Sequence, residues 1–350
     1  MTWYSAPEQA KAPQPFKKEK IWILDYSFYI WNGTHALRVD CGCDGTNIEC
    51  RCKGKKKYYL TNSKDEVISG LHFVLSQVIY RLKAGWKVYT AFDPPRDQLT
   101  RIQLLDSYKG QRPSMPEYVR HQMEVGKLIL SLMENVECYY SDCDESDDVM
   151  ATLAVEKANE GHEVVVASDD KDMYPLLAHP NITLYRQHTF FTAKDFVRNF
   201  GFEPRRFDEY LAIAGDVADN FSGIKGLGEK AATELIQKYP HVRDLFNDWD
   251  GVVPKYQKKL SYIECDGKNH DVCGNSILVK ENNSKICTKC RKFKNLIMLK
   301  DQLELSFKLA QLEIKAEYRR VNKPAGKDVV LKMLQELELK QAIDNIDLFF

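Results

Sequence analysis

Short apolar runs that end in carboxylates alternate with amphipathic segments over the first half of the chain. Residues 21–24 (IWIL) are followed by Asp25, KVYTAF is followed by Asp93, and EVVVAS is followed by Asp169 and Asp170. Each run is typical of a buried strand. Apolar residues recur at spacings of three and four between the runs, which predicts helices over residues 66–82, 116–133 and 147–159. Strands that alternate with helices predict an α/β core with a mainly parallel sheet.

The pattern changes at residue 195 from strands to helices and turns. DEYLAIAGD, SGIKGLGEKAATELIQKY and a helical pair around residues 236–249 predict a helical lobe, and helical patterning returns at residues 301–316 and 328–339. The predicted organisation is a disordered tail at 1–19, a core at 20–195, a lobe at 196–250, an inserted module at 251–294, helices at 295–340 and a final tail at 341–350.

The composition excludes some classes of protein but does not identify a function. The chain has 350 residues and 44% apolar content, which is enough for a substantial core. No apolar stretch approaches the roughly 18 residues of a membrane span, and no secretory leader is recognisable. We therefore expect a cytoplasmic monomer with no membrane contact. The 50 basic residues balance the 50 acidic ones, so the total charge does not identify a partner.

Nine carboxylates are placed to share one crevice, because ligands of open parallel sheets bind outside the carboxyl ends of the strands. Like charges that crowd together repel and raise one another's pKa, so such a cluster is stable when cations lie within it. Oxygen ligands favour Mg²⁺ or Mn²⁺, and two such ions could promote displacement at phosphorus. The nine are Asp25, Asp93, Glu145, Asp147, Asp148, Asp170, Asp172, Asp216 and Asp219. Any one of them could instead cap a helix or solvate a turn, and only their joint placement favours metal.

Glycines precede a strong helix pattern in SGIKGLGEKAA. Their spacing suits a helix-hairpin-helix, also called a helix-three-turn-helix, whose turn needs φ > 0 and whose backbone amides can approach phosphate. The expected duplex contacts are Gly223, Gly226, Gly228 and Lys230. The alternative is a glycine turn that only joins two core helices.

Cations accompany an aromatic residue between Asp93 and Glu145. This mixture suits a path for single-stranded nucleic acid, although a solvated helical surface explains the charges almost as well. The residues are Arg96, Arg101, Tyr108, Lys109, Arg112 and Arg120.

Together these motifs resemble the 5′ nuclease family, which includes phage 5′ exonucleases, the 5′ nuclease domain of bacterial DNA polymerase I and cellular flap endonucleases. The resemblance covers about residues 20–250. It is carried, in the family's order, by LDYSFYIW, AFD, RIQLLDSYKGQR, DESDDVMATLA, SDDKDMYPLL and AGDVADNFSGIKGLGEKAA. It implies a PIN-like twisted sheet with a helical arch at residues 94–140. The implied activity is metal-dependent 5′-3′ exonuclease or flap endonuclease cleavage of branched or primed DNA, such as 5′ flaps, nicks and RNA–DNA primers, in replication or repair.

The resemblance also implies roles for single residues. One metal would lie near Asp25, Asp93, Glu145 and Asp147, and a second near Asp170, Asp172 and Asp219, with Asp148 and Asp216 acting partly through water. Lys109 and Arg112 would contact the scissile phosphate, Arg101 would be a further arch cation, and Tyr108 would stack on the terminal base. A K⁺ ion is implied at the glycine hairpin. The compact size favours a phage or stand-alone bacterial enzyme.

Two cysteine clusters fall in insertions that the family pattern does not explain. Four thiolates, Cys265, Cys273, Cys287 and Cys290, suit a structural zinc site in a segment rich in lysine, although His270 could replace Cys265. The insertion at residues 39–60 carries Cys41, Cys43, Cys50 and Cys52, either as a second zinc site or as reduced surface thiols. Cys138 and Cys143 are expected to be plain core or loop residues.

The chain ends in NIDLFF, from Asn345 to Phe350. The two phenylalanines either fold back on the core or form a docking peptide, since NIDLF is similar to the motif by which replication proteins engage sliding clamps.

Two rival functions remain open. One is a PIN-type ribonuclease, which the glycine hairpin and GDVADN disfavour. The other is a catalytically silent DNA-junction binder or clamp adaptor, which the intact carboxylate set disfavours.

Overall fold

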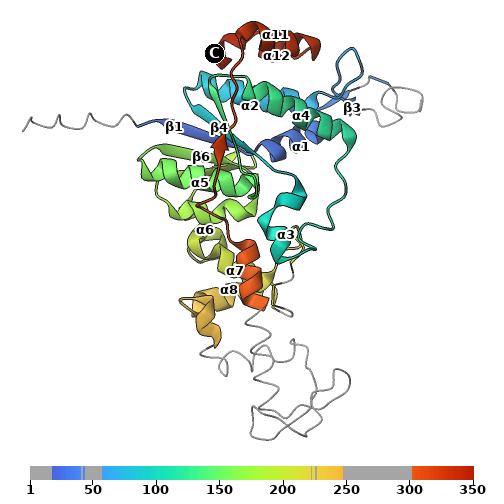
Figure 1. Cartoon of the computed structure of the whole chain (residues 1–350). Helices are drawn as coiled ribbons and strands as arrows, with labels where there is room; N and C mark the ends of the chain where they lie inside the picture. Colours follow the sequence, from blue (N-terminus) through green and yellow to red (C-terminus); the bar gives the residue numbers. More distant parts are fainter. Residues whose placement is uncertain (1–17, 41, 44–56, 222, 225–226, 247–301) are drawn as a thin grey trace, which may run out of the picture.

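The computed structural model describes residues 18–40, 42–43, 57–221, 223–224, 227–246 and 302–350 (Figure 1). Its centre is a seven-stranded sheet of order β8-β7-β6-β1-β4-β5-β9, parallel except for β8 and β9 at its two edges. The strands are β1 (Lys20–Leu24), β4 (Lys87–Phe92), β5 (Val136–Tyr140), β6 (Glu163–Ala167), β7 (Ile182–Arg186), β8 (Thr189–Phe191) and β9 (Arg319–Arg320).

Helices cover both faces of this sheet and form a lobe below it in Figure 1. The α-helices are α1 (Tyr26–Ala36), α2 (Ser69–Lys83), α3 (Thr100–Leu104), α4 (Glu117–Ser131), α5 (Ser146–Asn159), α6 (Ala193–Phe200), α7 (Phe207–Ala214), α8 (Glu229–Lys238), residues 302–310, α11 (Lys327–Glu336) and α12 (Lys340–Ile343). Short 3₁₀ helices are η1 (Arg96–Gln98), η2 (Lys171–Ala178), η3 (Pro204–Arg206), η4 (Val242–Phe246) and η6 (Ile346–Phe349).

Strict alternation in the strands supplies two separate cores. In β1, Trp22 and Leu24 pack with α1, α2 and α4, whereas Ile21 and Ile23 pack with α5 and the lobe. Side chains of a strand point alternately to opposite faces, so a run that is apolar at every position is buried on both sides. The predicted strands and helices of the core are confirmed.

The order of the strands reverses at β1. The chain passes from β1 to β4 and β5 on one side, and then crosses through α5 to β6 and β7 on the other side. A crevice opens outside the carboxyl ends of the strands at such a switch point. The topology therefore directs the loops after β1, β4 and β6 toward one place.

The predicted helical arch at residues 94–140 is only partly correct. η1, α3 and the turns up to residue 116 leave the sheet, but α4 packs on α1 and α2, and β5 is an inner strand of the sheet. The apolar face of α4, which includes Val119 and Ile129, is buried in the core, so this helix cannot also stand away from it.

In the first insertion, β2 (Arg38–Asp40) and β3 (Lys57–Tyr59) pair antiparallel. Of the cysteines between them the structure describes only Cys43, which is half-buried; Cys41, Cys50 and Cys52 lie outside the described residues. The predicted zinc module at 251–294 and the predicted tail up to residue 17 also lie outside them. Cys138 is buried in β5 and Cys143 is exposed.

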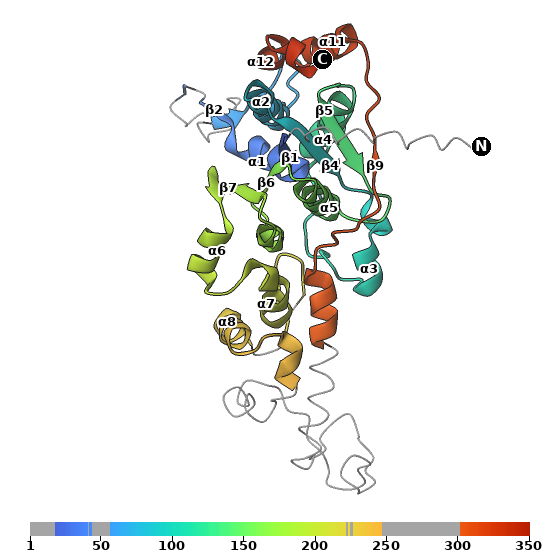
Figure 2. The ribbon, with the colours of Figure 1, turned by 90° about the vertical axis from the view of Figure 1, so that its left-hand side faces the viewer.

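The last 40 residues connect the lobe to the opposite end of the core. Helix 302–310 lies beside α7, and residues 311–326 then run along the molecule, add β9 to the sheet edge and reach α11 and α12 (Figures 1 and 2). We call residues 311–326 the strap. No helix in the described part of the chain is long and apolar enough to cross a bilayer.

The C-terminal tail folds back on the core. Phe349 is fully buried and Ile346 is buried in the core cluster that includes α2, and the Phe349 carbonyl accepts hydrogen bonds from the backbone N–H groups of Glu134 (2.9 Å) and Asn135 (3.1 Å). The apolar anchors that a clamp-binding peptide would offer are thus already occupied. The structure favours the core-packing alternative over the docking peptide.

We expect Phe349→Ala to lower the free energy of unfolding by about 3 kcal/mol, because it leaves a cavity in the core. Thermal unfolding of this variant measures the loss. Val329→Ala on α11 is the matched control, since Val329 is half exposed and should be nearly neutral. An unchanged melting temperature together with lost binding to a sliding clamp would restore the docking-peptide hypothesis.

Candidate active site

Asp25 is fixed where β1 passes into α1. Its Oδ1 accepts a hydrogen bond from Phe28 N (3.0 Å), which caps the helix, and its Oδ2 accepts one from Ser168 Oγ (2.6 Å) after β6. Burial, with the negative charges of Asp170 and Asp93, raises the pKa of Asp25, although both hydrogen bonds oppose this. The ends of β1 and β6 are thereby joined at a carboxylate that is costly to keep charged.

Asp93, after β4, connects two helix starts. Its Oδ1 accepts hydrogen bonds from the backbone N (2.9 Å) and the Oγ (2.7 Å) of Ser146, and its Oδ2 accepts one from Ser27 Oγ (2.9 Å). Ser27 lies in the first turn of α1, and Ser146 is the first residue of α5. Asp93 therefore orients the neighbouring acidic residues Glu145 and Asp147 relative to Asp25.

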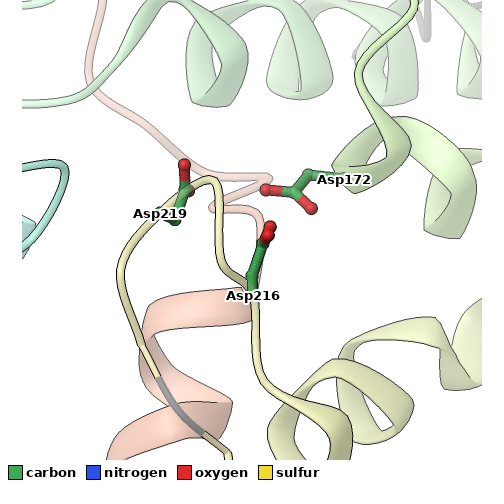
Figure 3. Close-up of side chains that lie close together, drawn as sticks. All are labelled: Asp172, Asp216 and Asp219. Carbon is green, nitrogen blue, oxygen red and sulfur yellow. The ribbon is translucent and has the colours of Figure 1, made fainter. Parts of the chain in front are cut away.

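Three aspartates from two elements form a compact group. Asp172 lies in η2, and Asp216 and Asp219 lie in the loop after α7; one carboxylate oxygen from each lies within 4.8 Å of the others (Figure 3). Asp172 Oδ1 is buried and has no hydrogen-bond partner among the described residues. A buried carboxylate oxygen without a donor, facing two further carboxylates, fits a hard divalent cation.

Asp170 lies between this trio and the carboxylates around Asp25. Burial is the main reason why the pKa values of Asp25, Asp147 and Asp172 are raised, and the charge of Asp170 adds to the rise in all three. The structure thus brings the sequence-predicted residues of both metal groups into one electrostatic unit.

Cations from the segment after α3 pair with the carboxylates. Lys109 Nζ lies 2.5 Å from Glu145 Oε1 and 3.6 Å from Asp219 Oδ2, and Arg112 lies 2.8 Å from Asp219 Oδ1. Lys109 has a left-handed backbone (φ 51°), and its N–H donates to the Asp219 carbonyl (3.1 Å). This pairing holds the basic segment against the acidic loop. Lys171, which the sequence did not single out, pairs with Asp216 at 2.9 Å.

Arg101 and Asp148 pair with each other in the structure. Arg101 is largely buried and donates to Asp148 (2.5 and 2.7 Å), to Glu145 (2.8 Å) and to the Gln311 carbonyl (2.8 Å). Asp148 Oδ1 also accepts from Glu313 N (2.8 Å). Arg101 is thus held by Glu145 and Asp148, and both carboxylate oxygens of Asp148 accept hydrogen bonds from protein donors.

Tyr108, which is predicted to stack on a terminal base, is enclosed by protein in this arrangement. Its side chain is only 2% exposed, and its hydroxyl lies 3.0 Å from Glu145 Oε2 and 2.9 Å from Asp219 Oδ2. A ring enclosed by protein has no free face for a base. Tyr108 instead links the Glu145 side of the site to Asp219.

A glycine-bearing loop connects α7 to α8. Gly223 has φ +55°, and a Cβ there would lie 2.3 Å from Gly215 N, so only glycine fits. Gly228 caps α8 without a side-chain hydrogen bond, and it and Lys230 are exposed. Gly226 lies outside the described residues.

Comparison with known proteins agrees with this architecture. Residues 44–201 match the family model of the 5′-3′ exonuclease N-terminal resolvase-like domain, and residues 202–268 match that of the 5′-3′ exonuclease C-terminal SAM fold. The chain is 31% identical over 194 residues to the flap endonuclease Xni of Pectobacterium carotovorum, covering 55% of this chain and 74% of that protein. It is 28% identical over 337 residues to a 5′-3′ exonuclease of Aquifex aeolicus, covering 94% and 96%.

Other matches show how far the likeness extends. The DNA polymerase I of Thermus thermophilus is 30% identical over 201 residues, which is 57% of this chain but only 24% of the polymerase. Among solved structures, flap endonuclease-1 from Methanococcus jannaschii has a TM-score of 0.57 at 15% identity and 95% and 92% coverage of the two chains. The zinc-bound T5 5′-exonuclease has a TM-score of 0.55 at 14% identity and 95% and 99% coverage. At these identities the structures show a shared fold.

A resolvase-like α/β fold with a carboxylate cluster at the switch point of its sheet is the architecture of a metal-dependent nuclease. The chain belongs to the 5′-3′ exonuclease family.

We expect Asp172→Asn to lower cleavage of DNA by at least about a hundredfold while binding to DNA persists, because a metal ligand is lost and the phosphate contacts are not. In chelator, the same change should raise the melting temperature. Burial and the charges of Asp170, Asp219 and Asp216 raise the pKa of Asp172, so its ionisation destabilises the folded metal-free protein. The destabilisation by ionised Asp172 is absent below the ordinary aspartate pKa and grows as the pH rises above it. The increase in melting temperature on replacement by asparagine should therefore also grow with pH.

Asp169→Asn is the matched control for this experiment. Asp169 adjoins Asp170, but its Oδ1 accepts from Gln187 N (2.7 Å) in the β7–β8 turn, so its replacement should leave cleavage near normal. Wild-type cleavage by Asp172→Asn would exclude Asp172 as a metal ligand.

Proposed function

We propose that this protein is a structure-specific 5′ nuclease that hydrolyses phosphodiesters in branched or primed DNA during replication or repair. The observation that carries the proposal is the trio of Asp172, Asp216 and Asp219, with a buried, unpartnered oxygen, at the switch point of the sheet. Relatives named 5′-3′ exonuclease and flap endonuclease support the same reading.

Two divalent cations, Mg²⁺ or Mn²⁺, are the proposed cofactors. Asp172, Asp216 and Asp219 would hold one, and Asp25, Asp147 and Asp170 would take part in the other. When bound, such ions supply an activated water and stabilise negative charge on phosphate oxygens. Their charge would also relieve the repulsion that raises the pKa values of Asp25, Asp147 and Asp172.

Lys109 and Arg112 are the proposed phosphate contacts. Both already point into the acidic group, and Arg112 remains half exposed (52%), so a phosphate could share its guanidinium with Asp219. Fixed cations at the point where charge develops stabilise the transition state without reorganisation. Tyr108 and Arg101 both donate hydrogen bonds to Glu145 and would thereby keep it in place as the partner of Lys109.

Duplex DNA is proposed to contact the glycine loop between α7 and α8. The exposed start of α8, with Gly228 as cap and Lys230 in its first turn, offers backbone N–H groups and a positive charge to phosphate. Gly223 and Gly226 would complete this contact, with a K⁺ ion as a further candidate ligand of the loop. Contacts of this kind position a duplex without reading its sequence.

The cysteine module at residues 251–294 is proposed to bind a structural zinc ion through Cys265, Cys273, Cys287 and Cys290. Zinc should stay with the protein through dialysis, and the double variant Cys287→Ser and Cys290→Ser should release it. Metal analysis of protein purified without chelator is the measurement, and the absence of zinc would refute the module.

We expect Lys109→Ala to lower the cleavage rate by about a hundredfold or more with little change in DNA affinity, since a cation aimed at the transition state adds little to ground-state binding. Single-turnover cleavage and equilibrium binding in Ca²⁺ separate the two effects. Lys308→Ala is the control, because Lys308 is an exposed lysine of the neighbouring pocket beside Glu145. Equal losses of rate and affinity would make Lys109 a simple phosphate anchor.

End-labelled 5′-flap, nicked, RNA-primed and all-RNA substrates test the function itself, each with and without Mg²⁺. The proposal expects Mg²⁺-dependent cleavage near the junction of single strand and duplex, with a 5′-phosphate product. Cleavage restricted to all-RNA substrates would favour the ribonuclease alternative, and binding without any cleavage would favour the junction-binder alternative.

A further inference from the structure

We propose that a patch of aromatic side chains around Arg81 binds the single-stranded part of the DNA substrate, an inference that rests on the proposed nuclease function. The patch lies on the face of the sheet that carries α1, α2 and α4, toward β7 and β8. We call it the Arg81 patch; it consists of Trp22, Tyr80, Arg81, Trp86, Tyr185 and Phe190.

Arg81 is a buried cation that lacks a carboxylate partner in the described part of the chain. Its side chain is 8% exposed, and its guanidinium carbon lies 3.5 Å from the centre of the Trp22 ring and 5.0 Å from that of Tyr185. Its Nε is buried without an acceptor. A buried charge is costly unless it is paired, so aromatic faces alone leave this guanidinium undercompensated.

Trp22 provides a second unpaired donor in contact with the first. Its indole Nε1 is buried and has no acceptor among the described residues. Buried indole N–H groups usually find a partner. Two adjacent donors without acceptors indicate a ligand that carries acceptor oxygens and negative charge, as a phosphodiester does.

The rim of the patch offers open aromatic faces. Tyr80 is 63% exposed and Phe190 is 56% exposed, although Phe190 stands edge-on against the buried ring of Trp22 (6.4 Å) and the partly buried ring of Tyr185 (5.3 Å). Lys20 Nζ lies 5.6 Å from the centre of the Trp86 ring. Exposed rings anchored on a rigid base can stack with unpaired bases, while the cations attract the backbone.

Charge around the patch is favourable for an anion. The nearby carboxylate of Glu19 pairs with Lys87 at 2.8 Å, and the last turn of α2 adds Lys83 beside Arg81. Charge complementarity together with open π faces therefore favours single-stranded nucleic acid over an acidic peptide, which would use the cations but not the rings.

One end of the patch approaches the loop that carries Asp170, whereas Lys20 and Trp86 lie at the amino ends of β1 and β4. Tyr185 pairs in register with Ala167, which immediately precedes the loop from Ser168 to Asp170, and Arg186 donates to the Asp169 carbonyl (3.1 Å). α1 and α2 lie over β1 and β4, while β7 lies beyond β6 on the other side of β1 (Figure 2). Tyr185 and Phe190 therefore form the end of the patch that an unpaired strand leaving the carboxylates would reach first.

The test measures binding in chelator, where no cleavage occurs, with a labelled single-stranded oligothymidylate, a 5′-flap substrate and a nicked duplex without a flap. The double variant Tyr80→Ala and Phe190→Ala should bind the oligothymidylate and the flap at least about tenfold more weakly, since each lost base stack is worth about tenfold. Affinity for the flapless nicked duplex should not change. Leu128→Ala, an equally exposed apolar side chain on α4, should leave all three affinities unchanged.

Arg81→Met tests the buried charge separately. It keeps much of the side-chain volume, so it should preserve the fold, weaken oligothymidylate binding and make that binding less sensitive to salt. Unchanged single-strand affinity in both variants, or an equal loss on the flapless duplex, would overturn the proposal. The two proposals fail separately: a wild-type protein that binds single strands through the patch but cleaves no substrate in Mg²⁺ would disprove the nuclease function and keep the patch.

Discussion

The repulsion between crowded carboxylates is the constraint around which this structure is organised. The topological switch at β1 brings Asp25, Asp93 and Asp170 to one edge of the sheet, and burial makes the charge of Asp25 costly. Short polar contacts hold them there: Ser168 on Asp25, Ser27 and Ser146 on Asp93, and Lys109 on Glu145. The negative charge of this site is only partly balanced by fixed cations. The site therefore favours divalent metal ions, which would in turn bind the phosphate of the substrate.

The same constraint explains why elements distant in sequence are needed to complete the site. Arg101 neutralises Glu145 and Asp148. The strap holds Arg101 through the Gln311 carbonyl and Asp148 through the Glu313 N–H. Thr152 in α5 adds two further bonds to the strap, with Glu313 and Ala316. The C-terminal residues thus stabilise the active-site side of α5 before they cross to the far end of the core.

The proposed path of DNA follows from where positive charge and open rings remain. Around the carboxylates most cations are already paired, whereas α8 presents an exposed N-terminus and the Arg81 patch holds donors without acceptors. Duplex at the lobe, the scissile phosphate at the carboxylates and unpaired bases at the patch would each meet a surface with matching chemistry. Each of these contacts is sequence-independent, as a structure-specific enzyme requires.

The sequence by itself determined the three inner strands that precede Asp25, Asp93 and Asp169, the core helices and the carboxylates, because apolar periodicity and the position of an acidic residue after a strand are local signals. It also singled out Lys109 and Arg112, which the structure places beside Glu145 and Asp219. Only the tertiary structure decided that Asp148 and Arg101 neutralise each other, that Tyr108 is enclosed between Glu145 and Asp219, and that Phe349 covers the core. Those outcomes depend on partners that lie up to hundreds of residues away in the sequence. A local sequence pattern does not show whether a charged side chain will pair with another protein group or with a ligand.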